Sequence, residues 1–279
     1  MRKKLKRPIA SFILLTNLIF WPLFLLVVAT KLLGLPNIVF DFMLCVSSWS
    51  STFAFVILFR KMYPGQSLIA YVKTQFKNRL HFSIITVVVS IQVFVAIVVL
   101  VIMASENDGL SSSFTISSFG MLVYLFFKNS LAGPLGEELG WRGFALNELQ
   151  KRYSPLSASV ILGFWWGLWH FPVWFTTGFI GVNLINYIVF FMVAIISISI
   201  IITAFYNLNK NLVIPIIIHL FFNFFIGLIG GNAIELIKYN AILYAVVALI
   251  LIVLNPKKVL FGKKETSSVK SSLQLEVKK

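Results

Sequence analysis

The stretch FSIITVVVSIQVFVAIVVLVIMA, residues 82–104, decides the class of fold, because it holds no charged residue over a length that can cross a lipid bilayer. A spanning helix needs about 20 mostly apolar residues. Seven further stretches of this chain meet the same measure. We therefore predict eight spanning segments, at about residues 10–33, 38–59, 80–104, 114–133, 157–175, 184–206, 212–230 and 238–254.

The composition of the whole chain agrees with this class. Hydrophobic residues make up 59% of the sequence and charged residues only 12%, with a mean hydropathy of +0.92. Soluble domains average about 45–50% apolar and about 25% charged residues, so a soluble globular domain is excluded. No repeat or linker divides the chain. We predict an all-α, polytopic membrane helix bundle of about eight transmembrane helices, in which residues 1–256 form a single membrane domain.

The basic residues gather on one side of this predicted bundle. The chain has 24 lysines and arginines against nine acidic residues, which gives a formal net charge of +15. The basic residues crowd into the N-terminus, the loop at 60–79 and the tail at 257–279, all of which share one side if there are eight spans. Positive loops mark the cytoplasmic side. The expected location is the cell membrane, with both termini cytoplasmic.

Two basic segments are expected to meet lipid rather than nucleic acid. The tail, residues 257–279, has neither interleaved aromatic residues nor a fold of its own, so we predict a disordered cytoplasmic tail that contacts anionic lipid headgroups. The loop at 60–79 begins with a turn signal and is expected to form an interfacial helix. Its ragged apolar face comprises Leu68, Tyr71, Val72 and Phe76.

A pair of glutamates lies in GPLGEELGWR, residues 133–142. A charged side chain costs roughly 2.5–3.5 kcal/mol at the centre of a spanning helix, so the pair needs a physical reason. Pro134 suits the first turn of a helix, where the positive helix end favours carboxylates. Glu138 and Arg142 are four apart and are expected to form an ion pair. Glu137 points about 100° away from Glu138 and is therefore the better candidate for an acid or base.

Two histidines occur at helical spacing from a second side chain. Trp166 and His170 are four apart in GFWWGLWHFP, and His219 and Asn223 are four apart in NLVIPIIIHLFFN. Taken singly, each pair has a structural explanation: an aromatic belt, an interhelical hydrogen bond, or a salt bridge in the case of the glutamates. Together they occupy three separate spans and can converge. Such a cluster has the parts for water activation and oxyanion stabilisation, or for binding a metal.

The ordered set of three motifs resembles the CPBP family of intramembrane endopeptidases, also called the ABI or CAAX-protease-like family. The family motif Glu-Glu-x-x-x-Arg stands at residues 137–142. Its second motif, an aromatic residue followed four later by histidine, stands as Trp166 and His170, with tryptophan in place of the usual phenylalanine. The third, His-x-x-x-Asn, stands as His219 and Asn223. The resemblance covers roughly residues 120–230, less than half of the chain.

The resemblance implies that the protein hydrolyses peptide bonds. Carried over by position, Glu137 with His170 would activate a water molecule. His219 and Asn223 would stabilise the tetrahedral oxyanion. The residues implied to hold the site in shape are Glu138, Arg142 and Trp166. The implied substrate is a short hydrophobic, prenylated or bacteriocin- or pheromone-like peptide that reaches the site from the membrane.

Metal dependence stays open, because the family has also been read as metallopeptidases. The helical zinc motif His-Glu-x-x-His is absent, and Cys45 is the single cysteine, which excludes a thiolate zinc cluster. A zinc site built from Glu137, His170 and His219 with one open position is still chemically reasonable. We favour a metal-free glutamate mechanism without a cofactor.

Two functions other than proteolysis also stay open. The chain could be a bacteriocin-immunity or regulatory membrane protein that keeps the motifs for structure, or a transporter that uses the buried carboxylate as a proton relay. Serine and aspartyl intramembrane proteases are set aside. The chain has no Gly-x-Ser-Gly run, and neither of its aspartates, Asp41 and Asp108, lies in a Gly-x-Gly-Asp context.

Overall fold

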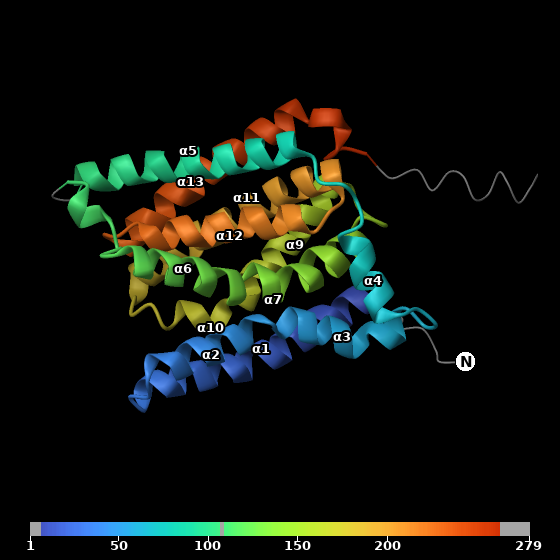
Figure 1. Cartoon of the computed structure of the whole chain (residues 1–279), viewed down its shortest axis with the longest axis horizontal. Helices are drawn as coiled ribbons and strands as arrows, with labels where there is room; N and C mark the ends of the chain where they lie inside the picture. The colour runs from blue at the N-terminus through green and yellow to red at the C-terminus, as the bar shows by residue number, and fades with distance from the viewer. Residues whose placement is uncertain (1–6, 107–108, 263–279) are drawn as a thin grey trace, which may run out of the picture.

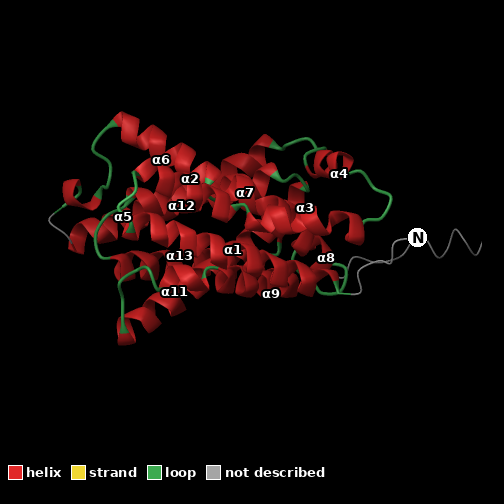
Figure 2. Ribbon diagram, turned by 90° about the horizontal axis from the view of Figure 1, so that it is seen from below, coloured by secondary structure: helices red, strands yellow, loops and turns green. Residues whose placement is uncertain are grey.

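The computed structural model describes residues 7–106 and 109–262, and all regular structure in these ranges is helical apart from one isolated bridge between Phe114 and Ile229 (Figures 1 and 2). The elements are α1 (Pro8–Leu32), α2 (Asn37–Ser48), α3 (Ser50–Met62), α4 (Leu68–Gln75), α5 (Phe82–Glu106), η1 (Ser111–Ser113), α6 (Phe119–Leu131), α7 (Pro134–Glu138), η2 (Leu139–Leu146), α8 (Asn147–Leu149), α9 (Pro155–Trp169), α10 (Phe171–Trp174), α11 (Gly181–Asn209), α12 (Val213–Leu228), α13 (Ala233–Leu254) and η3 (Pro256–Lys258).

Every one of the eight predicted segments contains helix. Within the described ranges, five helical segments are long and apolar enough to cross a membrane: α1, α2 together with α3, α5, α11 and α13. The apolar helices α9 and α12 are shorter, at 15 and 16 residues. The chain is therefore an all-α, multi-pass membrane bundle, as the hydropathy of the sequence predicts.

The second predicted span is interrupted, and the fourth is followed at once by a new helix. The second breaks at Trp49, between α2 and α3, where Ser47 and Ser48 donate back to the carbonyls of Leu44 and Cys45. Hydroxyl side chains that bond to their own backbone in this way often bend helices. The fourth, predicted at 114–133, contains α6 and ends in a turn at residues 132–133, after which α7, η2 and α8 follow. This turn separates the glutamates from α6 and starts a new helix at Pro134.

The helices that carry the three motifs lie next to one another in the bundle. In Figure 1, α1, α2 and α3 run along one side and α5 and α13 along the opposite side, with α6, α7, α9 and α12 between them. The long helix α11 packs against α9, α12 and α13, while α12 also contacts α7. The contacts of α7 with α12 and of η2 with α9 bring the three motifs together.

The basic loop does form a helix, α4, but Tyr71 is turned toward the protein. Its ring packs against those of Phe55 and Phe59, and its hydroxyl donates to the carbonyl of Gly143 at 2.7 Å. Burial raises the pKa of Tyr71 to about 12, so the phenol keeps the proton that it donates. The helix thereby holds η2 from outside.

The first residues of the predicted tail, up to residue 262, pack against the bundle. The chain forms the turn η3 and then docks on the bundle, where Leu260 is fully buried. The amide of Leu156 donates to the Leu260 carbonyl, and the Asn207 side chain donates to the Val259 carbonyl. The apolar side chains of Val259 and Leu260 explain the docking. The many lysines of the tail hide this apolar pair when only the composition of the segment is considered. The rest of the predicted tail, from residue 263, lies outside the described residues.

Candidate active site

The two glutamates occupy a short helix wedged into the bundle. Pro134 is at the first position of α7, as predicted, and the side chains of Glu137 and Glu138 are almost fully buried at 3% and 0% exposure. The helix continues as η2, a π-helix that contains Arg142. Stretches of π-helix are rare and frequently occur at functional sites.

Glycines let this helix approach α3 closely. Gly136 and Gly140 lie four residues apart and face the break between α2 and α3. A Cβ atom on Gly136 would overlap the indole of Trp49, and one on Gly140 would lie 2.6 Å from the carbonyl oxygen of Ser51. Small residues at this spacing are how membrane helices bring their backbones together.

Glu138 accepts two hydrogen bonds on one oxygen. Arg142 Nη1 donates to Glu138 Oε1 at 2.9 Å, which is the ion pair expected from the spacing. His219 Nδ1 lies 2.7 Å from the same oxygen. The contact with His219 was not expected, because the sequence places that histidine on a distant helix with Asn223. Glu138 therefore ties α7 to α12.

Glu137 is not bonded to Arg142. Its Oε2 accepts a hydrogen bond of 2.7 Å from Trp166 Nε1, and its backbone carbonyl accepts one of 3.0 Å from Ser51 Oγ. Among the described residues, no hydrogen bond joins its other carboxylate oxygen. Glu137 thus retains one oxygen for a further partner, which agrees with its selection as the candidate base.

Trp166 contacts most of the cluster. Its carbonyl accepts a hydrogen bond of 2.9 Å from His170 Nδ1, while its ring lies 4.0 Å from the guanidinium of Arg142 and 4.9 Å from the ring of His219. The described contacts link Glu137 and His170 through Trp166 and include no direct hydrogen bond between them. An indole N–H is a donor that phenylalanine lacks, so the tryptophan at this position fixes Glu137 as well as filling space.

Both histidines use the same ring nitrogen for anchoring. Nδ1 of His170 donates to a carbonyl, and Nδ1 of His219 donates to a carboxylate that also pairs with Arg142. The Nε2 atom of each ring is therefore the one that could exchange a proton or bind a substrate atom. A neutral ring then offers a lone pair at Nε2, and a protonated ring offers an N–H there. At His219, the positive charge of a protonated ring would be offset by the carboxylate of Glu138.

Asn223 and His219 border the start of α7. A Cβ atom placed on Gly133 would lie 2.9 Å from Asn223 Nδ2, 3.0 Å from the carbonyl oxygen of Asn129 and 3.8 Å from His219 Nε2. The His219–Asn223 pair is thus brought beside the glutamate helix, and glycine at position 133 is what allows it.

We expect Gly133→Ala to disturb this corner selectively. The new methyl group would clash with the carbonyl oxygen of Asn129, a backbone atom that cannot move without shifting the helix. It would also displace the side-chain amide of Asn223. The expected result is a loss, by about 10-fold or more, of the peptide hydrolysis that the resemblance implies. A modest loss of stability, of about 1–3 kcal/mol, should accompany it. Turnover and thermal unfolding in detergent measure the two effects. Gly227→Ala, whose methyl would make only ordinary contacts at 3.4 Å or beyond, is the matched control; equal damage from both variants would contradict the argument.

The donors of the cluster do not form a three-ligand metal site as they stand. Among the residues that the structure describes, no group of three His, Cys, Asp or Glu side chains is placed to hold a metal ion. One Glu138 oxygen and both Nδ1 atoms are already engaged within the protein. We therefore assign no step of the reaction to a metal, and the preference for a metal-free mechanism stays a prediction.

Sequence reasoning missed the contribution of the second span. Ser51 holds the Glu137 carbonyl, and Ser50 Oγ accepts a hydrogen bond of 3.1 Å from Trp169 Nε1. The Trp169 ring in turn packs against His170 at 4.6 Å. A signal was present: the run SSWSST, residues 47–52, places five hydroxyl residues in an otherwise apolar span.

The comparisons with known proteins fall on this cluster. Residues 118–225 match the model of the family described as type II CAAX prenyl endopeptidase Rce1-like, and this range holds all seven residues named from the motifs. The matched region resembles the CPBP family. A CAAX prenyl protease 2 from Methanococcus maripaludis is 42% identical over 71 residues, which are 24% of this chain and 26% of that relative. The match thus spans about a quarter of the relative's length.

The matched region runs from the start of α6 into α12. Helices α1 to α5 and α13 lie outside the match, although α3 supplies Ser50 and Ser51 to the site. The cluster is therefore built mainly, but not wholly, from the part of the chain that carries the family signature.

Proposed function

We propose that this protein is an intramembrane endopeptidase that hydrolyses a peptide bond with a water molecule activated by Glu137 and His170. The observation that carries the proposal is the division of labour between two adjacent buried carboxylates. Glu138 is paired with Arg142 and bonded to His219, whereas the Glu137 side chain accepts its hydrogen bond, among the described residues, from the neutral indole of Trp166. A purely structural pair would not need the second carboxylate.

The proposed first step is deprotonation of water by Glu137, with Nε2 of His170 as the second group able to hold a proton. The water oxygen attacks the carbonyl carbon of the peptide, which converts it to a tetrahedral oxyanion. The proton taken from water is then delivered to the leaving nitrogen as the C–N bond breaks. Proton transfer of this kind contributes about 10²–10⁴-fold to a rate.

The oxyanion is proposed to be stabilised by the amide of Asn223 and by Nε2 of His219. Asn223 Nδ2 is a neutral donor at the start of α7. His219 can donate from Nε2 only as an imidazolium, because its Nδ1 already donates to Glu138. The carboxylate of Glu138 is placed to stabilise that charge. Donors held in a water-poor site are worth about 10²–10³-fold each in such reactions.

The proposed substrate is a hydrophobic peptide, and specifically one with a lipid modification. Support comes from the CAAX prenyl endopeptidase description of the matching family and from the name of the archaeal relative, a CAAX prenyl protease. The distribution of basic residues further supports cytoplasmic termini, so we place the reaction toward the cytoplasmic interface.

The purified full chain tests the proposal with a farnesylated peptide and the same peptide without the lipid, each with and without a metal chelator. We expect hydrolysis at a single bond, faster for the farnesylated peptide, and unchanged by the chelator. Loss of activity with the chelator and recovery with Zn²⁺ would overturn the metal-free mechanism. Equal rates for both peptides would contradict the lipidated substrate alone. Failure to cleave any hydrophobic peptide would contradict the proposed activity.

A further inference from the structure

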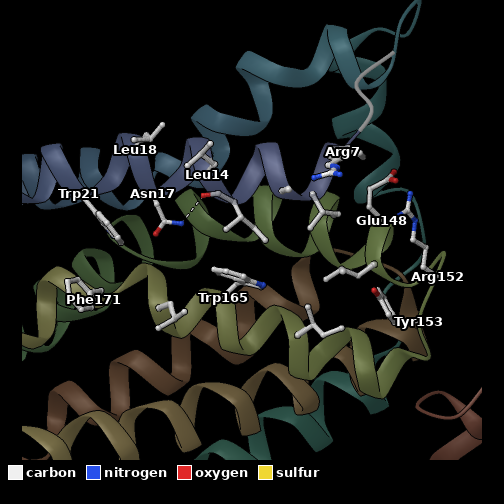
Figure 3. A pocket seen from close by; sticks show the side chains of 17 residues that line it. Arg7, Leu14, Asn17, Leu18, Trp21, Glu148, Arg152, Tyr153, Trp165 and Phe171 are labelled. Atoms are coloured by element: carbon white, nitrogen blue, oxygen red, sulfur yellow. Dashed lines mark hydrogen bonds between the residues drawn. The ribbon is translucent and has the colours of Figure 1, made fainter. Parts of the chain in front are cut away.

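A cavity separate from the cluster of site residues lies between α1 and α9 (Figure 3). Its volume is about 760 Å³, within the range of about 300–1,000 Å³ common for small-molecule sites, and none of the seven site residues lines it. The side chains that define this α1–α9 groove are those of Arg7, Leu14, Trp21, Arg152, Trp165 and Phe171.

One end of the groove is positively charged. Arg7 and Arg152 gather there, as Figure 3 shows, and neither forms an ion pair with a described residue. The acid at this end, Glu148, is already engaged by the ammonium of Lys151 and by the hydroxyl of Tyr63. Two guanidinium groups are therefore available to an anion from outside the chain.

Apart from Asn17 and Tyr153, the rest of the groove is apolar. Leu14 and Leu18 are 62% and 60% exposed along it, and the rings of Trp21 and Phe171, 5.7 Å apart, stand at the far end. Fourteen residues of chain separate Arg7 from Trp21. At 1.5 Å per helical residue they span about 21 Å, compared with about 15 Å for half of a 30 Å hydrocarbon core. The groove therefore matches the depth of one membrane leaflet and its headgroup region.

We propose that the α1–α9 groove binds an anionic phospholipid, with the phosphate at Arg7 and Arg152 and one acyl chain against α1 and α9. A peptide fits less well, because its backbone N–H and C=O groups would need partners. The amide of Asn17, midway along the groove, already donates to the carbonyl of Ile13. The unpaired positive charge selects an anionic headgroup over a zwitterionic one.

Fluorescence quenching by brominated lipids tests this proposal, because Trp21 and Trp165 line the groove. The full chain in neutral detergent is titrated with phosphatidylglycerol or phosphatidylcholine that carry the same brominated acyl chains. We expect phosphatidylglycerol to quench at the lower mole fraction. Each cation near a membrane surface contributes about 1 kcal/mol, so Arg7→Gln/Arg152→Gln should weaken phosphatidylglycerol binding about 30-fold.

Two controls fix the location of the lipid. Arg60→Gln/Arg79→Gln removes the same charge from the basic loop and should change the affinity by less than about 2-fold. Ala10→Phe fills the groove and keeps both arginines, so it should abolish the preferential quenching. Equal quenching by the two lipids, equal losses in both arginine pairs, or unchanged quenching in Ala10→Phe would overturn the proposal. Displacement of the lipid by glycerol phosphate at equal concentration would also overturn it, since that result assigns binding to the phosphate alone.

Discussion

Glu137→Gln is expected to lower kcat for peptide cleavage by about 10³-fold and to leave the fold intact, within the range of about 10²–10⁴ for loss of a general base. Glutamine has the same shape, and its amide oxygen can still accept the hydrogen bond from Trp166 Nε1 that Glu137 Oε2 accepts now. It cannot take a proton from water. The loss should therefore fall on kcat, with little change in KM, because the substitution removes an interaction that matters chiefly in the transition state.

The measurement is steady-state cleavage of the farnesylated peptide, together with thermal unfolding of both proteins in the same detergent. Glu235→Gln provides the matched control, since it removes an acid from the first turn of α13, outside the cluster, where the side chain pairs with Lys238. The control should cleave at the wild-type rate. Wild-type turnover by Glu137→Gln would remove Glu137 from the mechanism and return the pair to a structural role.

The second large effect concerns stability. Glu138→Leu should destabilise the protein by about 3–5 kcal/mol, because it leaves the buried guanidinium of Arg142 without its ion-pair partner. Arg142 is fully buried, and its Nε and Nη2 already lack hydrogen-bond partners among the described residues. Removal of Glu138 would also remove the ion pair that Arg142 forms through Nη1. Unfolding in detergent, followed by circular dichroism, measures the loss.

A double variant separates the two roles of Glu138. Glu138→Leu/Arg142→Met removes both charges and keeps similar volume, so most of the lost stability should return. Cleavage should stay low, because His219 no longer has the acceptor that orients its ring. A single variant as stable as the wild type would contradict the buried ion pair. Full activity in the double variant would show that the carboxylate serves the scaffold alone.

Features set by local spacing could be predicted from the sequence. The helical segments, the start of a helix at Pro134 and the pair formed by Glu138 and Arg142 all depend on residues within one or two turns of each other. Hydropathy and the geometry of a single helix are sufficient for such features. They also sufficed to separate Glu137 from the arginine.

Features that depend on distant residues could not be predicted. The contact of His219 with Glu138 joins positions 81 residues apart, and spacing does not reveal which of two adjacent carboxylates a histidine on another helix will reach. The serines at the break between α2 and α3 were missed for a similar reason. Ser51 is polar in an apolar span, but its partner, the Glu137 carbonyl, is a backbone group that leaves no trace in the sequence. The docking of Leu260 was masked by the lysines around it.

The close approach of Gly136 and Gly140 to the break at Trp49 has an evolutionary consequence. Position 140 admits glycine alone, because any Cβ atom there would collide with the backbone of Ser51. Position 136 admits another residue only if the Trp49 indole moves and loses the hydrogen bond that it donates to the Leu131 carbonyl. Neither glycine takes part in proton transfer. A descendant that abandoned catalysis could therefore lose its glutamate and histidines yet would still need both glycines to fold. This glycine spacing is expected to outlast the chemistry and to mark inactive descendants of the same scaffold.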